Sequence, residues 1–448
     1  MRAWTSCILI LVPLVLMARI IHSSSDSNVQ LHINKQGRVY ILDCPINLHG
    51  DTLNLAANSS LKFINRASLE NGTVCGNNST IDSAPTHIFN NITVIGSWSQ
   101  DTVYGQWFTQ SSRLTESNAY FNNLMVLSKG SRLTHLYTPA ETLTVDAVNG
   151  SGVIKVPSNV YWHNLTTISL RPNNYEKFSI IHLDNVNDVT IDGGAVIGDV
   201  DAHIGEKGEW GHGIKCGGAK NIIIRNIECN YCWGDGIDLI EGQYIDGIAS
   251  INCDNILIEN AKCLYNRRQG MSIEAATNVL VKNSVFSHTG AIRATPPTAG
   301  IDIEPWSNNC DKIYNIEIDN CSFYDNGGFD ITFQTNLWRK DYKEYNSQTY
   351  MTDCKVKTCE FKYAGGVNVN RCNIDSLAIY YSANINFEDS NIKIYNPGRN
   401  VQNINFINSK VAQSSDIVSY MICFFVDSLS KLKNLIVSYE NNRHNNYP

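Results

Sequence analysis

The stretch that decides the fold lies between residues 236 and 305, where one short phrase returns three times: Gly236-Ile237-Asp238-Leu239, Gly270-Met271-Ser272-Ile273 and Gly300-Ile301-Asp302-Ile303. Each copy places a glycine before alternating apolar and polar residues, and further copies start at Gly213, Gly328 and Gly366. The six copies start 23, 34, 30, 28 and 38 residues apart. A repeat of short strands with loops of variable length predicts a parallel β-solenoid, in which each coil packs on the next.

A second phrase follows in most coils, an apolar strand that runs into asparagine. Four such strands end at Asn226, Asn260, Asn283 and Asn320. We expect these side chains to stack and to hydrogen-bond along the turns, which gives them a structural role.

The chain divides by pattern into three parts. Residues 1–25 combine Arg2 with an apolar run and small residues, which predicts a signal peptide and a secreted, periplasmic or cell-surface location. A retained membrane anchor is the alternative, because Ile20 and Ile21 extend the run. Residues 26–122 are rich in strand patterns and predict an N-terminal β-rich capping module. Residues 123–448 predict the parallel β-helix, and one short helix is expected within 105–135.

The charge balance bears on the kind of partner. The 448 residues carry 35 Lys and Arg against 42 Asp and Glu, for a net charge of −7, which argues against nucleic acid. A polysaccharide fits this charge, including an anionic one if a local basic patch exists. Arg267 and Arg268 are the best candidates for that patch. Beyond the N-terminal segment no stretch is apolar enough to span a membrane.

The cysteines have two interpretations. Fourteen cysteines in an exported chain suggest a disulfide framework, but Cys229, Cys263 and Cys321 occupy similar positions of the repeat, which favours buried core thiols. Cys229 and Cys232 have the spacing of a metal-binding pair. No second pair stands at a zinc-site distance, so we assign no metal ligand.

Strand alternation predicts two external columns of polar side chains. The first holds Asp238, Ser272, Asp302 and Asp330, and the second holds Glu274, Glu304 and Thr332. Adjacent coils lie ~4.8 Å apart, so carboxyl groups in a column raise one another's pKa, and one can be an acid while its neighbour is a base or nucleophile. We predict catalysis by Asp302, Glu304, Glu274, Asp238, Asp330 and Asp235. Neighbouring coils give the separation of retaining glycosidases, and diagonal pairs that of inverting ones.

A simpler interpretation applies to each acidic residue taken singly, because outward carboxylates can solvate a strand face or cap a turn. Stacked like charges lower stability unless they are used or neutralised, and this favours a functional site for the cluster as a whole. No cofactor is required, although Ca²⁺ is one group that could neutralise the column.

A charged insertion and several aromatic residues complete the predicted site. The segment from Asp199 to His212 could bring acid–base groups and Trp210 over the groove. We predict substrate binding by Arg267, Arg268, Trp210, His212, Trp233 and Trp306. An ordinary polar loop and core-capping tryptophans are the alternatives.

The coil pattern over residues 140–411 resembles the right-handed parallel β-helix proteins of the pectate-lyase-like superfamily. The phrases that carry the resemblance are 233–237, 266–270 and 299–305, which look like those of secreted bacterial and phage-associated members. The N-terminal part is similar to leader regions in gut Bacteroidetes. The resemblance implies the fold and a carbohydrate ligand, but no single reaction, since the superfamily includes polygalacturonases, lyases, epimerases and tailspike depolymerases.

The chain departs from the polygalacturonase pattern. Gly211-His212-Gly213 precedes the acidic coil rather than following it, and no Arg-Ile-Lys is present. We therefore expect a secreted carbohydrate-active protein that hydrolyses a polysaccharide by paired carboxylates. The alternatives are a lyase acting on a uronic-acid polymer and a non-catalytic glycan-binding or adhesion module. A monomer is favoured over a tailspike-like trimer, because phage tail parts do not carry export signals.

Overall fold

A computed structural model describes the backbone of residues 19–21, together with residues 30, 32–108, 117–242, 251–305, 313–335 and 346–413. Within these ranges the strands pair in parallel. The described residues fall into two compact units, those up to residue 100 together with 105–108, and 101–104 together with those from residue 117 onward. No helix in the described ranges is long and apolar enough to cross a membrane.

The first unit is a small stack of parallel strands. They pair in the order β1-β2-β5-β6-β3, and β4 and β7 also pair with β6. Alternate side chains, among them Leu42, Leu61 and Phe89, are buried in its core. The elements are β1 Arg19–Ile21, β2 Val39–Leu42, β3 Ile46–Asn47, β4 Thr52–Asn54, β5 Ser60–Phe63, β6 Leu69–Asp82, β7 Phe89–Trp98 and the 3₁₀ turn η2 Gly105–Trp107.

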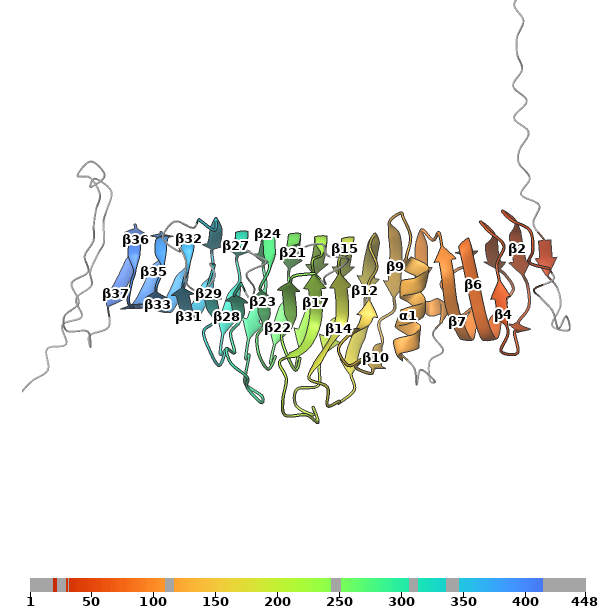
Figure 1. The fold of residues 1–448 in the computed structure, drawn as a ribbon, viewed down its shortest axis with the longest axis horizontal. Helices are drawn as coiled ribbons and strands as arrows, with labels where there is room; N and C mark the ends of the chain where they lie inside the picture. The colour runs from red at the N-terminus through yellow and green to blue at the C-terminus, as the bar shows by residue number, and fades with distance from the viewer. Residues whose placement is uncertain are drawn as a thin grey trace, which may run out of the picture. The chain divides into compact units, whose positions relative to one another are not determined.

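The second unit stacks its coils side by side (Figure 1), and their strands form three parallel ladders, of which the first two merge at β31. The first ladder contains β11 Gly152–Lys155, β14 Lys177–Asp184, β17 Trp210–Gly217, β20 Ile237–Ile240, β23 Met271–Ile273, β26 Ile301–Ile303 and β29 Ile331–Phe333. The second contains β10 Thr142–Val145, β13 Thr167–Leu170, β16 Ala195–Ile197, β19 Glu228–Asn230, β22 Lys262–Leu264, β25 Val285–Ser287 and β28 Ser322–Tyr324. Both continue into β31 Lys355–Lys362, β33 Asn373–Tyr380, β35 Asn391–Pro397 and β37 Lys410–Gln413.

The third ladder completes the coils. Its strands are β8 Thr102–Tyr104, β9 Thr134–Thr138, β12 Val160–Asn164, β15 Asn187–Asp192, β18 Lys220–Arg225, β21 Cys253–Glu259, β24 Ala276–Lys282, β27 Tyr314–Asp319, β30 Thr349–Thr352, β32 Gly365–Asn370, β34 Ala383–Glu388 and β36 Gln402–Ile407. Similar side chains stack in register from one coil to the next, as in the column formed by Ile222, Ile256, Val279 and Ile316. These side chains are buried, and burying each contributes ~1.5–3 kcal/mol. The predicted parallel β-helix is confirmed.

One helix lies within the expected range. Helix α1 Ser117–Ser128 contacts β8 to β11, and its side chains Tyr120, Phe121 and Leu124 are buried. Phe121 packs edge-on against Trp162 of β12. The sequence prediction of a short helix between residues 105 and 135 is therefore confirmed.

The asparagine ladder forms as the sequence predicts. Asn260 donates its amide hydrogen to the Asn226 side chain at 2.8 Å, and Asn320 does the same to Asn283. All four residues have positive φ, between 48° and 56°, a conformation that asparagine tolerates better than most residues. These asparagines therefore shape one corner of each coil and take no part in chemistry.

The cysteines are thiols in the described part of the chain, and nine of them are buried. This confirms buried thiols for Cys229, Cys263 and Cys321, although the three do not form one column. Cys229 and Cys263 lie in adjacent rungs of the second ladder, because Glu228 is in register with Lys262. Cys321 belongs to another column, where the Cys354 sulfur accepts its backbone N–H at 3.4 Å.

Close contact between rungs explains the recurring glycine. A Cβ atom on Gly213 or Gly236 would lie 2.7 Å from the carbonyl oxygen of the glycine in the next rung, and a Cβ on Gly270 would clash with the Gly300 carbonyl. Only glycine fits this position, which is the corner where the first ladder begins. Two of the six phrases fall outside this column, because Gly366 lies in the third ladder and Asp330 replaces a glycine opposite Gly300.

We predict that Gly270→Ala destabilises the protein by about 1–3 kcal/mol, because the added methyl must push two rungs apart. Chemical denaturation of the full chain measures this change. The control is Gly327→Ala, whose Cβ would meet its nearest atoms at 3.1 Å and 3.2 Å. Equal losses in the two variants would contradict the role assigned to the column.

Candidate functional site

The first ladder sets a single column of polar side chains along the outside of consecutive coils. Strand register fixes its order as Lys155, His182, Lys215, Asp238, Ser272, Asp302, Thr332 and Glu360. The predicted stacking of Asp238, Ser272 and Asp302 is confirmed. Thr332, however, lies in this column rather than beside Glu304. The column has a basic half and an acidic half, and the two meet between Lys215 and Asp238.

Asp330 does not belong to this column, so its predicted place beside Asp302 is wrong. Its side chain is buried and accepts the backbone N–H groups of Lys357 at 2.7 Å and Thr358 at 3.1 Å, and the Asn326 amide at 2.8 Å. Two extra residues separate Gly328 from the strand that follows, so the phrase at 328–331 is shifted against its neighbours. Asp330 instead ties the residue before β29 to the backbone of Lys357 and Thr358 within β31.

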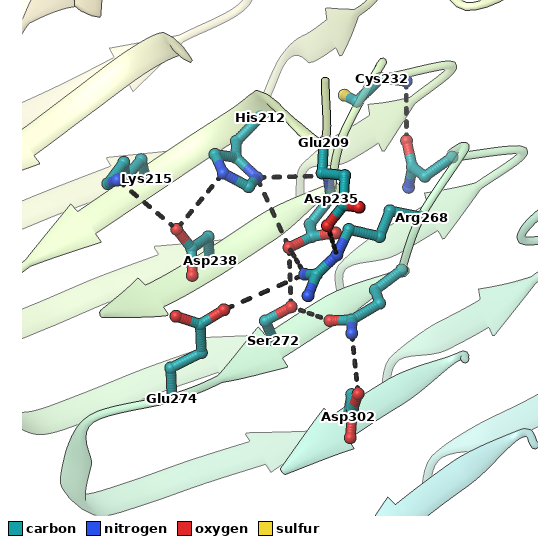
Figure 2. Close-up of polar contacts among 12 residues, drawn as sticks. Glu209, His212, Lys215, Cys232, Asp235, Asp238, Arg268, Ser272, Glu274 and Asp302 are labelled. Atoms are coloured by element: carbon teal, nitrogen blue, oxygen red, sulfur yellow. Dashed lines mark hydrogen bonds and ion pairs between the residues drawn. The ribbon is translucent and has the colours of Figure 1, made fainter. Parts of the chain in front are cut away.

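Asp235 lies at the centre of the cluster (Figure 2). It is fully buried at the corner before β20, and its Oδ2 atom lies 3.1 Å from Arg268 Nη1 and 2.7 Å from Ser272 Oγ. Burial raises the pKa of Asp235, while Arg268 and Ser272 partly oppose this shift. These contacts stabilise the ionised form of a carboxyl group that burial alone would keep protonated.

His212 lies between Asp235 and Asp238. The Asp235 backbone N–H donates to His212 Nδ1 at 3.2 Å, so a neutral ring carries its proton on Nε2. Nε2 in turn lies 3.6 Å from Asp238 Oδ2. Burial, and then the nearby Lys215 and Arg268, hold the pKa of His212 well below its usual range. His212 is therefore a neutral member of the acidic cluster, buried to 2% exposure rather than displayed to solvent.

Asp238 combines burial with unused hydrogen-bonding capacity. Neither of its carboxyl oxygens has a hydrogen-bond partner within the described residues. Lys215 Nζ lies 3.9 Å from Oδ2 and is its nearest cation. Burial raises the pKa of Asp238 to about 7, with Lys215 opposing and Asp235 adding to the shift. A carboxyl group that titrates near neutral pH and has free oxygens is suited to acid–base chemistry.

Glu274 and Asp302 are the other acids of the cluster. Burial raises the pKa of Glu274 well above its usual range, and repulsion from Asp238 and Asp235 adds to this. Burial and the neighbouring Glu304 do the same for Asp302, which accepts the Gln269 amide at 2.8 Å. Five of the predicted acids, Asp235, Asp238, Glu274, Asp302 and Glu304, therefore lie close together. Asp235, Asp238 and Asp302 are buried, whereas Glu274 and Glu304 are half-buried.

Arg268 connects the cluster to the insertion before β17. Its Nε atom lies 3.5 Å from Glu209, and its Nη1 atom 4.0 Å from Glu274. The side chains of Lys215, Glu274 and Arg268 are 19%, 15% and 13% exposed, so they form the solvent-facing edge of the cluster.

Arg267 and Trp233 have structural roles, which corrects their prediction as substrate-binding residues. Trp233 is fully buried, with His203 stacked on it at 3.8 Å and the Arg267 guanidinium at 3.8 Å from its ring. Arg267 also donates to the carbonyl oxygens of Arg293 and Gly208. Neither side chain is available to a sugar. Together they clamp the insertions that border the acidic cluster.

Trp210 is the one predicted aromatic that the structure leaves open. Its side chain is 48% exposed and lines a surface hollow at the start of β14 and β17, formed with Asn149, Asn174, Tyr175, Glu176 and Lys177. Tyr175 is 37% exposed in the same hollow. Trp306 lies outside the described residues.

Sequence reasoning missed Lys215, His182 and Gln269 as members of the site, and it placed Ser272 in the column without giving it a role. Lys215 and His182 extend the column on its basic side, and Gln269 and Ser272 connect its carboxyl groups. Counting back from the phrase glycines would have placed Lys215 opposite Asp238, because Gly213 and Gly236 share the glycine column. No such signal marks Gln269, because its role depends on which way its amide points. In the described ranges no group of three or more His, Cys, Asp or Glu is arranged to hold a metal ion.

Comparisons with known proteins place the chain among parallel β-helix folds. No protein-family model matches it. It is 25% identical over 326 residues to the SPbeta prophage-derived uncharacterized protein YorA of Bacillus subtilis (strain 168), covering 66% of this chain and 55% of that protein. It is also 25% identical over 238 residues to the uncharacterized protein YclG of the same organism, covering 49% and 41%. The chain spans about half the length of the curated relatives it matches.

A solved structure supports the fold. The A-module of the mannuronan C-5 epimerase AlgE4 from Azotobacter vinelandii superimposes with a TM-score of 0.51 at 11% identity, covering 67% of this chain and 85% of that module. The likeness confirms the expected parallel β-helix. The resemblance to Bacteroidetes members stays a prediction.

We predict that Asp238→Asn makes the protein more stable above neutral pH. The folded pKa of Asp238 is raised to about 7, so the stability of its protonated form is present at acidic pH and is lost as pH rises through 7. The ordinary pKa of aspartate is 3.8, so the two pKa values differ by about three, which corresponds to a loss of roughly 4 kcal/mol in the free energy of unfolding at ~1.36 kcal/mol per pKa unit. The uncharged amide of asparagine avoids this loss. Unfolding of both proteins at pH 4 and pH 8 measures the difference. If Asp238→Asn were more stable than the wild type by the same amount at pH 4 and at pH 8, the proposed titration of Asp238 would be contradicted.

Proposed function

We propose that this protein is a carbohydrate-active enzyme that hydrolyses a polysaccharide by paired carboxylates. The observation that carries the proposal is the column in which Asp238 and Asp302 stand two rungs apart with Ser272 between them. Two rungs correspond to ~9.6 Å at ~4.8 Å per rung. This separation lies close to the ~6.5–9.5 Å of inverting glycosidases, where a water molecule fits between the two groups.

The surroundings of the two groups suggest different roles. Asp302 is the general acid, because burial and Glu304 favour its protonated form. Asp238 is the general base that activates water, because its oxygens are free of hydrogen bonds and its pKa is about 7. Asp235 and Arg268 form an ion pair that fixes the electrostatic environment between them. Glu274 sits at the solvent edge, where it meets the substrate.

The hollow around Trp210 is the proposed binding site for a further sugar of the chain. An exposed tryptophan offers a flat apolar face, and Asn149, Asn174 and Lys177 supply hydrogen-bonding groups around it. His212 lies two residues beyond Trp210 on the same strand β17. A polysaccharide can therefore contact the hollow and the acidic cluster together.

Uronate-directed lyase chemistry is the second candidate, and the basic half of the column favours it. Burial and the flanking Lys215 and Lys155 hold the pKa of His182 at about 4, so a neutral imidazole stands between two ammonium groups. Such a base could remove a proton beside a carboxylate that the lysines neutralise. The name of the similar structure, a mannuronan C-5 epimerase, describes an enzyme of uronate polymers.

Export and assembly remain proposals. Residues 1–25 would direct the chain to the cell surface, the periplasm or the medium, with residues 26–122 as an N-terminal module and 123–448 as the helix. We propose a monomer that acts on polysaccharide and binds neither nucleic acid nor, after cleavage, a membrane. If the protein is instead a non-catalytic glycan-binding or adhesion module, it should bind polysaccharide without cleaving it.

We predict that Asp302→Asn lowers turnover by about 10²–10⁴-fold, because the amide cannot donate a proton to the leaving group. Turnover is measured as new reducing ends on a panel of neutral and uronic-acid polysaccharides, with ultraviolet absorbance to detect unsaturated lyase products. The control is Asp325→Asn, whose side chain is 58% exposed. Hydrolysis that survives in Asp302→Asn would contradict the acid assignment. Absorbance in the wild type would favour the lyase.

A further inference from the structure

The Ser272 hydroxyl contacts two oxygen atoms that both need a proton donor. Its Oγ atom lies 2.7 Å from Asp235 Oδ2 and also contacts Gln269 Oε1, while Gln269 Nε2 lies 2.8 Å from Asp302 Oδ2. A serine hydroxyl has one proton, and a carboxylate oxygen and an amide oxygen are both acceptors. Ser272 cannot donate to both. The chain from Asp235 to Asp302 therefore needs one more proton, or a turned amide.

Two arrangements satisfy the contacts that Ser272 and Gln269 make with each other and with the two carboxyl groups, and they differ in which carboxyl group is protonated. In the first, Asp235 is protonated and donates to Ser272, Ser272 donates to the Gln269 carbonyl, and the Gln269 amide donates to ionised Asp302. In the second, Ser272 donates to ionised Asp235, the turned Gln269 amide donates to Ser272, and protonated Asp302 donates to the Gln269 carbonyl. The two ends of an asparagine or glutamine amide are distinguished only by such networks.

The charges around the two ends favour the second arrangement. Asp235 faces the Arg268 guanidinium at 3.1 Å and the neutral ring of His212 at 3.5 Å, with Glu209 farther out on Arg268. Glu304 favours the protonated form of Asp302 both by repulsion and as a side-chain hydrogen-bond partner, Asp235 repels its charge, and of the groups around Asp302 only Arg268 attracts it. The nearby Asp238 and Glu274 are carboxyl groups that add no positive charge. A negative charge is therefore more stable on Asp235 than on Asp302.

We propose that Ser272 and Gln269 are positioning residues that make Asp235 and Asp302 share one proton and that hold this proton on Asp302 in the resting protein. The catalytic meaning of this arrangement rests on the proposed hydrolase function, in which Asp302 is the acid. The two side chains then explain how a buried acid stays protonated beside an ionised carboxylate of the same cluster. Neither has to touch the substrate.

Titration of the carboxyl groups tests the proposal without any substrate. Infrared spectra of the full chain across pH follow the protonated carboxyl band, and Asp302→Asn and Asp235→Asn identify the two contributions. In Ser272→Ala the Gln269 amide is free to donate to Asp302, and Asp235 loses a donor. We expect the titration of Asp302 to move down and that of Asp235 to move up, each by about one pH unit or more. Ser272→Thr, which keeps the hydroxyl, should restore both.

Opposite shifts are the signature of a shared proton, since a purely structural loss at Ser272 would move both groups together or neither. Shifts in the same direction, or none, would overturn the proposal. Gln269→Ala is the second variant, and it should lower the titration of Asp302 alone, because only Asp302 loses its acceptor. If Ser272→Ala does not fold, this variant decides, and an unchanged Asp302 titration in it overturns the proposal.

The outcomes separate the relay from the proposed function. Opposite shifts in a protein that cleaves no polysaccharide would support the shared proton and reject the hydrolase. Unchanged titrations in a protein whose turnover depends on Asp302 would reject the shared proton and keep the hydrolase.

Discussion

The register of the parallel strands in the first ladder is the constraint on which the rest of the site depends. Because Ile237, Met271 and Ile301 stack in the core, the residues that follow them must stack outside. The glycine column keeps these rungs in register by letting the chain pass close to the carbonyl groups of the next coil. A one-residue slip would turn the acids inward and the isoleucines outward. The chemistry of the cluster is therefore a consequence of the packing of the coils.

Stacking also determines the electrostatics. Five carboxyl groups within neighbouring rungs share one guanidinium and one ammonium group at close range, so they cannot all be ionised. Arg268 stabilises a carboxylate on Asp235, while burial raises the pKa of Asp238, Glu274 and Asp302. Such a cluster reduces stability at neutral pH, a common property of sites that carry function. The Trp233 clamp provides rigid packing beside it.

Much of the fold and part of the site could be predicted from the sequence. The glycine phrase and the strand-ending asparagines indicated the coils, and alternation placed Asp238, Ser272 and Asp302 in one column. Asp330 was misplaced because the repeated sequence phrase does not by itself fix the strand register. Two extra residues after Gly328 put Thr332, rather than Asp330, opposite Asp302. Trp233 and Arg267 were predicted to bind substrate because the insertions that bury them lie far away in the sequence, and such burial leaves no signal in the neighbouring residues. Gln269 was missed because its role depends on the direction of its amide, whereas the glycine phrases at Gly213 and Gly236 already place Lys215 opposite Asp238.

The stereochemistry of cleavage tests the paired-carboxylate account most directly. Strand register places Asp238 and Asp302 two rungs apart, a spacing of ~9.6 Å that leaves room for a water molecule in an inverting mechanism. Proton NMR of the first product formed from a cleaved polysaccharide reports the anomeric configuration before mutarotation. The account predicts an inverted anomeric centre. A retained centre, or an unsaturated product, would contradict it.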